Sequence, residues 1–178
     1  MKTVYLHQRP FQCLLTPTQI ADRVRLLGQA ISQDFAGRKP LMVGVLNGAF
    51  VFVADLVRQL TIQPEIAFVR YASYEGMQST GKLQALLPLN EQVAGRDVIL
   101  IEDIVDSGHT MQQLIALAQQ EGAASVRVAS LLLKPDALQV PLTVDYVGFE
   151  IENRFVVGYG LDYDGQGREL AGIYVLAE

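Results

Sequence analysis

The sequence predicts an α/β domain in which helices flank a mostly parallel central sheet. Two observations carry this prediction. Apolar stretches of strand length alternate with stretches of helical periodicity along the chain, which is the pattern of strand–helix–strand units. One stretch, residues 97–101, carries four consecutive apolar side chains, as expected for a strand that is buried on both faces of a parallel sheet.

The first helix is expected to begin at Pro17. Apolar residues recur three or four positions apart from Ile20 to Phe35, so they share one helix face. Thr16 fits the N-cap, proline is favoured in the first turn, and Gly37 suits the end of the helix.

A strand, a tight loop and a second helix follow. Residues 41–46 form a short apolar run that leads into Asn47 and Gly48, and from residue 52 to residue 60 apolar side chains recur every four positions. This order predicts a strand whose carboxyl end turns directly into a helix.

A hairpin is predicted next. Residues 65–71 have the pattern of a strand, and residues 82–87 resume an apolar pattern after an intervening stretch, residues 73–81, that is polar and rich in small residues. We expect two strands joined by a long, mobile tip.

The remaining elements complete the α/β pattern. A helix is predicted over residues 111–120, ended by Gly122, and strands are predicted at residues 97–101, 126–133, 144–149, 155–159 and 173–176. The chain shows no internal repeat, low-complexity tract or interdomain linker, so we expect a single domain over residues 1–178.

Composition narrows the class of protein. Of the 178 residues, 50% are hydrophobic and 19% are charged, and the net charge of −5 disfavours a general electrostatic contact with a nucleic-acid backbone. The single cysteine excludes an internal disulfide and suits a reducing compartment. The first twelve residues lack an apolar segment, and the longest apolar runs have strand length. We therefore expect a cytoplasmic protein without a nucleic-acid or membrane partner.

The most informative segment follows the apolar strand at residue 101. Glu102, Asp103 and Asp106 stand at the carboxyl end of this strand, where open α/β sheets bind their ligands. Residues 107–110 then offer small hydroxyl side chains and backbone N–H groups at a helix start, which suits a phosphate. Helix capping alone would explain one aspartate, but the whole pattern favours a phosphorylated sugar whose hydroxyls, or hydrated magnesium, meet the carboxylates.

Two commoner phosphate motifs are absent from the chain. No G-x-x-x-x-G-K-[ST] sequence occurs, so a P-loop nucleotidase is not supported. Gly158 and Gly160 lack a third glycine at the spacing of a dinucleotide-binding fingerprint.

Residues 98–110 resemble the phosphoribosyl pyrophosphate motif of the type I phosphoribosyltransferases, in which an apolar strand leads into an acidic pair and a D-[ST]-G-x-T loop. Within that superfamily, residues 40–176 are similar, in collinear order, to the hypoxanthine-guanine phosphoribosyltransferases. The similar segments are Leu46-Asn47-Gly48-Ala49, Ala54-Asp55-Leu56, Ser73-Tyr74, Ser79-Thr80-Gly81, residues 129–134, residues 145–151 and residues 155–163, with Arg168 beyond them.

The resemblance implies a fold, a reaction and an assembly. The fold would be that of the type I phosphoribosyltransferases, with a small hood and a flexible lid loop. A ring nitrogen of a 6-oxopurine would attack the anomeric carbon of phosphoribosyl pyrophosphate in the presence of Mg²⁺, giving a nucleoside monophosphate and pyrophosphate. The family forms homodimers or homotetramers.

The resemblance also implies roles for the acidic segment. Asp106 would be the general base beside the imidazole edge of the purine. Glu102 and Asp103 would engage the ribose hydroxyls, directly or through hydrated magnesium. The 5′-phosphate would be bound by a loop in which the His109 side chain faces solvent; its residues are Ser107, Gly108, His109 and Thr110.

Five further residues would bind the base and the pyrophosphate. Lys134 would donate to the 6-oxygen of the base, and because an ammonium cannot accept a hydrogen bond it would favour an oxo group over the amino group of adenine. Phe155 would stack on the purine while the Val156 backbone reads its edge. Asp162 would hold magnesium against the pyrophosphate, and Arg168 would contact that group.

Two loops complete the implied site. The backbone of Asn47 and Gly48 would face pyrophosphate, in a peptide that the family often holds in the cis form, and Ser73 and Tyr74 would belong to the lid that closes over the site and excludes water. The chain differs from many relatives at Asn47 and at Ala72, where basic residues are frequent.

Two alternatives stay open at this point. A xanthine-preferring phosphoribosyltransferase would differ in how it reads the purine 2-position. A pyrimidine-operon attenuation regulator binds RNA on the same fold, but it needs a basic face that the net charge of −5 argues against. A non-catalytic nucleotide-binding module is disfavoured because Asp106 and Asp162 are both present.

Overall fold

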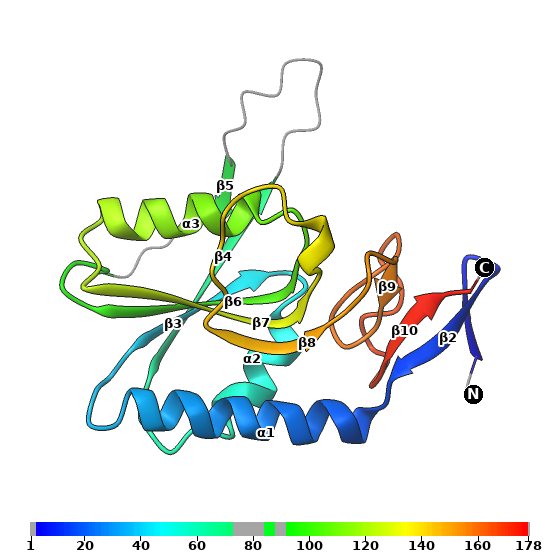
Figure 1. Cartoon of the computed structure of the whole chain (residues 1–178), viewed down its shortest axis with the longest axis horizontal. Helices are drawn as coiled ribbons and strands as arrows, with labels where there is room; N and C mark the ends of the chain where they lie inside the picture. Colours follow the sequence, from blue (N-terminus) through cyan, green and yellow to red (C-terminus); the bar gives the residue numbers. More distant parts are fainter. Residues whose placement is uncertain (1–2, 73–83, 88–91, 178) are drawn as a thin grey trace.

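A computed structural model describes residues 3–72, 84–87 and 92–177, and a six-stranded sheet forms its centre (Figure 1). The strand order is β5-β4-β3-β6-β7-β8, and all neighbouring pairs are parallel except β4 with the edge strand β5. The prediction of a mostly parallel central sheet is confirmed. Its strands are β3 (Leu41–Leu46), β4 (Glu65–Ala72), β5 (Gln84–Leu87), β6 (Asp97–Val105), β7 (Ser125–Leu133) and β8 (Tyr146–Glu150).

Helices cover both faces of this sheet. Figure 1 shows α3 on one face and α1 and α2 on the other. The alternating side chains of β6 explain why its sequence is apolar throughout, because Ile99 and Ile101 belong to the core beneath α1 and α2 whereas Val98 and Leu100 belong to the core beneath α3. The helices are α1 (Pro17–Asp34), α2 (Phe50–Val57) and α3 (His109–Gln120).

The predicted start of α1 is confirmed in detail. The Thr16 hydroxyl accepts a hydrogen bond from the Gln19 backbone N–H, and the Gln19 side chain accepts one from the Thr16 backbone N–H, which forms a capping box. Pro17 stands in the first turn, where its missing N–H costs nothing.

A second, antiparallel sheet lies beside the carboxyl edge of the central sheet, and we call residues 3–15 and 152–177 the hood (Figure 1). The strand order is β1-β2-β10-β9, so the first and last strands of the described chain share one sheet. The sequence did not predict β1 or β2. These strands are β1 (Thr3–Leu6), β2 (Arg9–Leu15), β9 (Val156–Val157) and β10 (Ile173–Leu176).

The predicted strand at residues 155–159 is too long. Only Val156 and Val157 pair as β9, because Gly158, Tyr159 and Gly160 all have positive φ and turn the chain away from the sheet. The predicted tip at residues 73–81, with its candidate lid residues, lies outside the described residues. None of the helices in the described part of the chain is both long and apolar enough to span a membrane.

Candidate active site

The acidic pair lies inside β6 rather than after it. The sequence predicts that this strand ends at residue 101, but it continues to Val105 because β7 pairs with it as far as the Val105–Leu133 register. Glu102 and Asp103 are consequently buried, with 9% and 8% of their surface exposed. The predicted end of this strand, residue 101, is wrong, and both carboxylates lie at its carboxyl end as predicted.

Burial changes the proton affinity of this pair. Burial raises the pKa of Glu102 well above its ordinary value, and the negative charge of Asp103 raises it further. Burial also raises the pKa of Asp103, while the nearby Arg168 guanidinium opposes that change. Two neighbouring carboxylates out of water therefore share an environment that disfavours two negative charges until a cation or hydrogen-bond donors arrive.

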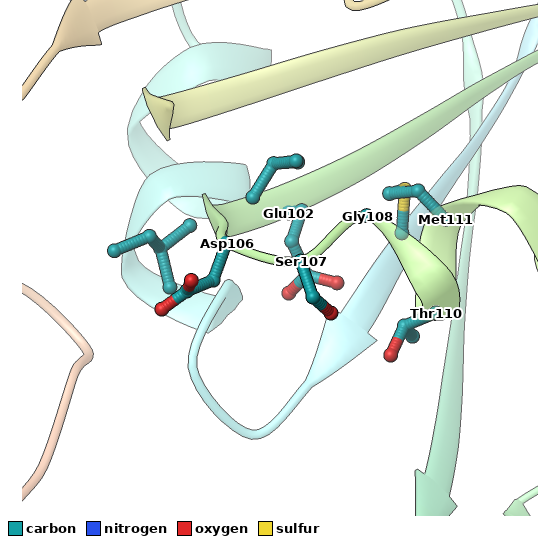
Figure 2. Close-up of a pocket in the computed structure, with 8 residues that line it drawn as sticks. Glu102, Asp106, Ser107, Gly108, Thr110 and Met111 are labelled. Carbon is teal, nitrogen blue, oxygen red and sulfur yellow. The ribbon is translucent and has the colours of Figure 1, made fainter. Parts of the chain in front are cut away.

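The loop after β6 forms a first pocket of about 240 Å³ (Figure 2). Gly108 is the N-cap of α3 with φ +85, and no side chain caps the first turn of this helix. The oxygen atoms of Asp106, Ser107 and Thr110 lie on the same side of the loop in Figure 2. A helix start with free backbone N–H groups and two neighbouring hydroxyls can bind a phosphate.

A second pocket of about 290 Å³ adjoins the first, since Ile104 and Asp106 line both. Its walls come from the loop between β3 and α2, from β6, from the end of β7 and from the hood. The lining residues are Gly48, Asp103, Ile104, Asp106, Lys134, Phe155, Val156, Leu161, Asp162 and Arg168.

Lys134 lies buried at this pocket, immediately after β7. Its ammonium donates to Asp106 Oδ2 at 2.8 Å, and 7% of the residue is exposed. The Asp106 side chain is half-exposed, so its second oxygen remains accessible from the pocket. The predicted general base and the predicted donor to the purine 6-oxygen are thus direct partners.

An aromatic platform forms the hood side of the pocket. Phe155 is 47% exposed, its ring meets Tyr163 edge-on at 5.5 Å between centroids, and the fully buried Phe11 lies behind it at 6.3 Å. An exposed ring held from behind and from the side offers a face on which a planar base can stack. Val156 is buried next to it.

Asp162 and Arg168, two further hood residues that line this pocket, form an ion pair. Arg168 Nη2 lies 2.6 Å from Asp162 Oδ1, Asp162 Oδ2 accepts from the Gly165 backbone N–H at 2.7 Å, and Arg168 Nη1 donates to the Gly160 carbonyl at 2.6 Å. Both charged groups border the cavity, so an anion and a cation can each find a partner there.

The loop at residues 46–49 packs directly onto the acidic pair. The peptide bond between Leu46 and Asn47 is cis, and a Cβ added to Gly48 would lie 1.7 Å from Asp103 Oδ2. No side chain fits at position 48, and the backbone of the loop therefore forms the pocket wall itself.

Four predicted site residues lie apart from both pockets or outside the described chain. Asn47 is exposed and is absent from both pocket walls. His109 is exposed, with Nε2 3.2 Å from Gln139 Oε1, as expected for a solvent-facing side chain. Ser73 and its neighbour Tyr74 lie outside the residues that the structure describes.

Sequence reasoning did not single out four residues that shape the site. Ile104 and Leu161 line the second pocket, and Phe11 and Tyr163 support the ring of Phe155. Apolar and aromatic residues of this kind are usually core residues, so their type carries no signal. The position of Ile104 between two acidic residues is the one available clue.

The fold and site define an α/β domain with a candidate phosphate pocket at the carboxyl edge of its sheet. The model of the phosphoribosyl transferase domain matches residues 14–164. The chain belongs to this family, and its fold is that of the type I phosphoribosyltransferases.

Individual proteins that are similar to this chain carry the names of phosphoribosyltransferases. The chain is 39% identical to a hypoxanthine-guanine phosphoribosyltransferase of Streptococcus thermophilus, with 93% of this chain and 92% of the relative covered. A crystal structure of a hypoxanthine-guanine phosphoribosyltransferase from Bacillus anthracis matches with a TM-score of 0.89 at 35% identity, covering 93% of this chain and 98% of that one. The chain is also 40% identical over 96% of its length to the bifunctional protein TilS/HprT of Listeria innocua, but it spans only 26% of that relative.

Proposed function

We propose that the chain is a purine-salvage enzyme that transfers the 5-phosphoribosyl group of phosphoribosyl pyrophosphate to hypoxanthine or guanine. The products would be IMP or GMP and pyrophosphate. The observation that carries this proposal is the second pocket, which Lys134, Asp106, Phe155, Asp162 and Arg168 line together, and which adjoins a pocket suited to a phosphate. Relatives with similar lengths carry the name of this activity.

The purine would lie between the aromatic platform and the Lys134–Asp106 pair. Phe155 stacks on the ring with its exposed face, and the backbone of Val156 meets the edge of the base. Lys134 donates to the 6-oxygen, and Asp106 takes the proton from the attacking ring nitrogen, a proton transfer worth about 10²–10⁴-fold in rate. The ion pair keeps Asp106 and Lys134 at a fixed separation before the purine binds.

The activated sugar would span the two pockets. Its 5′-phosphate binds at the start of α3, through the backbone of Gly108 and the hydroxyls of Ser107 and Thr110. Its pyrophosphate meets Arg168 and the backbone at Gly48. As the bond to pyrophosphate breaks, positive charge grows on the sugar carbon, and the carboxylates of the acidic pair would stabilise it.

The donor set of the site fits Mg²⁺. Proteins commonly hold this ion through one or two carboxylates together with substrate phosphates and water, and Asp162, Glu102 and Asp103 supply oxygen ligands of that kind. No group of three or more metal-ligating side chains occurs among the described residues, so the substrate would complete the coordination. Bound magnesium would neutralise negative charge on the leaving pyrophosphate.

The proposal extends to the assembly and the compartment. A single partly buried cysteine suits the reducing cytoplasm. Ile66 and Phe68 are exposed on the same side of β4, which supports self-association into a homodimer or homotetramer, and sedimentation analysis measures the state directly.

A turnover assay tests the activity. The purified chain is incubated with phosphoribosyl pyrophosphate, magnesium and one base at a time, and release of the nucleotide is measured for hypoxanthine, guanine, xanthine and adenine. We expect turnover with hypoxanthine or guanine and none with adenine, because Lys134 can only donate. A clear preference for xanthine would replace the proposed substrate, and the absence of turnover with every oxopurine would refute the proposal.

A further inference from the structure

A turn in the hood joins two of the segments that line the second pocket. Phe155 and Val156 precede this turn, and Leu161 and Asp162 follow it. Gly158, Tyr159 and Gly160, the three residues of the turn, have φ angles of +101°, +52° and +103°. A tyrosine seldom adopts such a conformation, because its Cβ approaches a backbone carbonyl, so its surroundings must hold it there.

The turn packs against the loop at residues 46–49. A Cβ added to Gly160 would lie 2.1 Å from the carbonyl oxygen of Gly48. The Gly160 carbonyl accepts the hydrogen bond from Arg168, whose guanidinium also pairs with Asp162. The position of the turn therefore determines where Arg168 and Asp162 lie relative to Gly48.

One side-chain hydrogen bond ties this turn to the central part of the molecule. The Tyr159 hydroxyl donates to Asp55 Oδ2 at 2.6 Å, and Asp55 belongs to α2, the helix that follows the 46–49 loop. Asp55 Oδ1 pairs with Arg58 on the same helix. Tyr159 is buried, and burial together with the Asp55 charge raises the pKa of its hydroxyl, which keeps the proton needed for this bond.

We propose that Asp55 and Tyr159 are positioning residues, which hold the turn at residues 158–160 against the 46–49 loop and so set the geometry of the subsite for pyrophosphate. This inference rests on the proposed function. Neither residue lines either pocket, so both act through Gly160, Arg168 and the loop.

The purine subsite is held by other contacts. The backbone of Val156 and Val157 pairs with β10, and Lys134 and Asp106 belong to the central sheet and its loops. Loss of the Asp55–Tyr159 bond should therefore weaken the use of phosphoribosyl pyrophosphate more than the use of the purine.

Steady-state kinetics of four proteins test this inference: the wild type, Tyr159→Phe, Asp55→Ala and the double variant. We expect each single substitution to raise KM for phosphoribosyl pyrophosphate by about 10-fold, the effect of losing one hydrogen bond to a charged group, with a change in KM for hypoxanthine of less than about 3-fold. The double variant should be no worse than the worse single variant, because both remove the same bond. Asp55→Asn keeps an acceptor oxygen, so its KM should rise less than that of Asp55→Ala.

Tyr146→Phe is the matched control. Tyr146 is as buried as Tyr159, with 6% exposed, and its hydroxyl donates to Asp34 Oδ2 at 2.7 Å, but it lies at the amino edge of the sheet. We expect an unchanged KM for phosphoribosyl pyrophosphate in this variant. Asp55 is partly exposed, so its variants test the same bond even if Tyr159→Phe fails to fold.

Several results would overturn the inference. Equal KM values for Tyr159→Phe and Tyr146→Phe, equal increases for both substrates, or a fall in kcat alone would show that the bond does not position the pyrophosphate subsite. Failure of the proposed function has a different signature, since the wild type would then lack turnover. Calorimetric binding of pyrophosphate with magnesium tests the inference in that case too, because Tyr159→Phe should weaken this binding and Tyr146→Phe should not.

Discussion

Charged side chains have opposite surroundings at the two edges of the central sheet, the amino edge, where the parallel strands begin, and the carboxyl edge, where they end. At the amino edge, two carboxylates at strand starts and one at the end of α1 pair with arginines on the surface. The pairs are Glu65 with Arg96 at 2.9 Å, Asp97 with Arg38 at 3.1 Å, and Asp34 with Arg127 at 2.9 Å. At the carboxyl edge, Glu102 and Asp103 are buried beside each other along the pocket walls. The same strands therefore carry neutralised charge at one edge and incompletely neutralised charge at the other.

This difference separates stability from function. Paired surface charges need no ligand, and their contribution to folding is small. Buried carboxylates with raised pKa values cost stability until a ligand supplies a cation or donors, and such groups gather at functional sites. Substitutions at the carboxyl edge should accordingly change turnover, and substitutions at the amino edge should change stability.

Asp106→Asn should have the largest effect. An amide cannot take the proton of the purine, so we expect kcat to fall by about 10²–10⁴-fold while KM for phosphoribosyl pyrophosphate changes little. Asp34→Asn makes the same chemical change at the amino edge, where it weakens the contacts to Arg127 and Tyr146, and it should keep its turnover. Near-wild-type kcat in Asp106→Asn would remove the distinction between the two edges.

Gly48→Ala should come next. The added Cβ would lie 1.7 Å from Asp103 Oδ2, so the loop or the carboxylate must move. A displacement of this size in a positioned site lowers kcat/KM by about 100-fold. Gly37→Ala is the control, because nothing lies within 4 Å of its added Cβ and its φ of +73° costs only stability, about 1 kcal/mol. Equal kcat/KM values in the two variants would contradict the assignment of Gly48 to the pocket wall.

The central sheet and the hood differ in how far the sequence predicts them. Helix and strand periodicity predicted α1, β3, α2, β6, α3 and β7 because each of these elements buries one face or both faces against the two cores that flank the sheet. The hood was harder to predict, since β1 has only four residues, and β9 has two residues that pair only because β10 lies beside them. Pairing between distant segments leaves no periodic signal.

The candidate site likewise contains residues that the sequence predicts and residues that it does not. Carboxylates and a small-residue loop after an apolar strand point to a ligand, so Asp106 and the start of α3 could be placed from the sequence. The support of Phe155 by Tyr163, and the bond from Tyr159 to Asp55, depend on contacts across more than a hundred residues or on ring packing. Tyrosine is common at ordinary core positions and aspartate at ordinary surface positions, so only the folded structure reveals these contacts.

At the amino edge, Tyr146→Phe should lower stability and leave turnover unchanged. The variant loses the hydroxyl that donates to Asp34 and accepts from Arg127, so we expect it to lose about 1.5 kcal/mol of the free energy of unfolding at pH 7 with unchanged turnover. Burial, followed by the bond to Asp34, raises the pKa of Tyr146 from 10.0 to about 12. Between these values the folded state keeps a proton that the unfolded state loses, so stability falls as pH rises.

The difference between wild type and variant should accordingly be complete below pH 10 and disappear by about pH 12. Chemical denaturation of both proteins across this range measures it. A difference that stays constant with pH would show that the hydroxyl contributes through packing and not through its proton.

Arg96→Ala should have the smallest effect. The Glu65 side chain is 62% exposed, and water already solvates it, so loss of the 2.9 Å ion pair should cost only about 0.5 kcal/mol of stability. Salt at 1 M shortens the screening length to about 3 Å, so the difference from wild type should vanish there, and turnover should be unchanged at either salt concentration. Urea denaturation at low and high salt provides the measurement. A cost above about 2 kcal/mol that persists in salt would mean that the amino edge, like the carboxyl edge, depends on desolvated charge, and the contrast between the two edges would then fail.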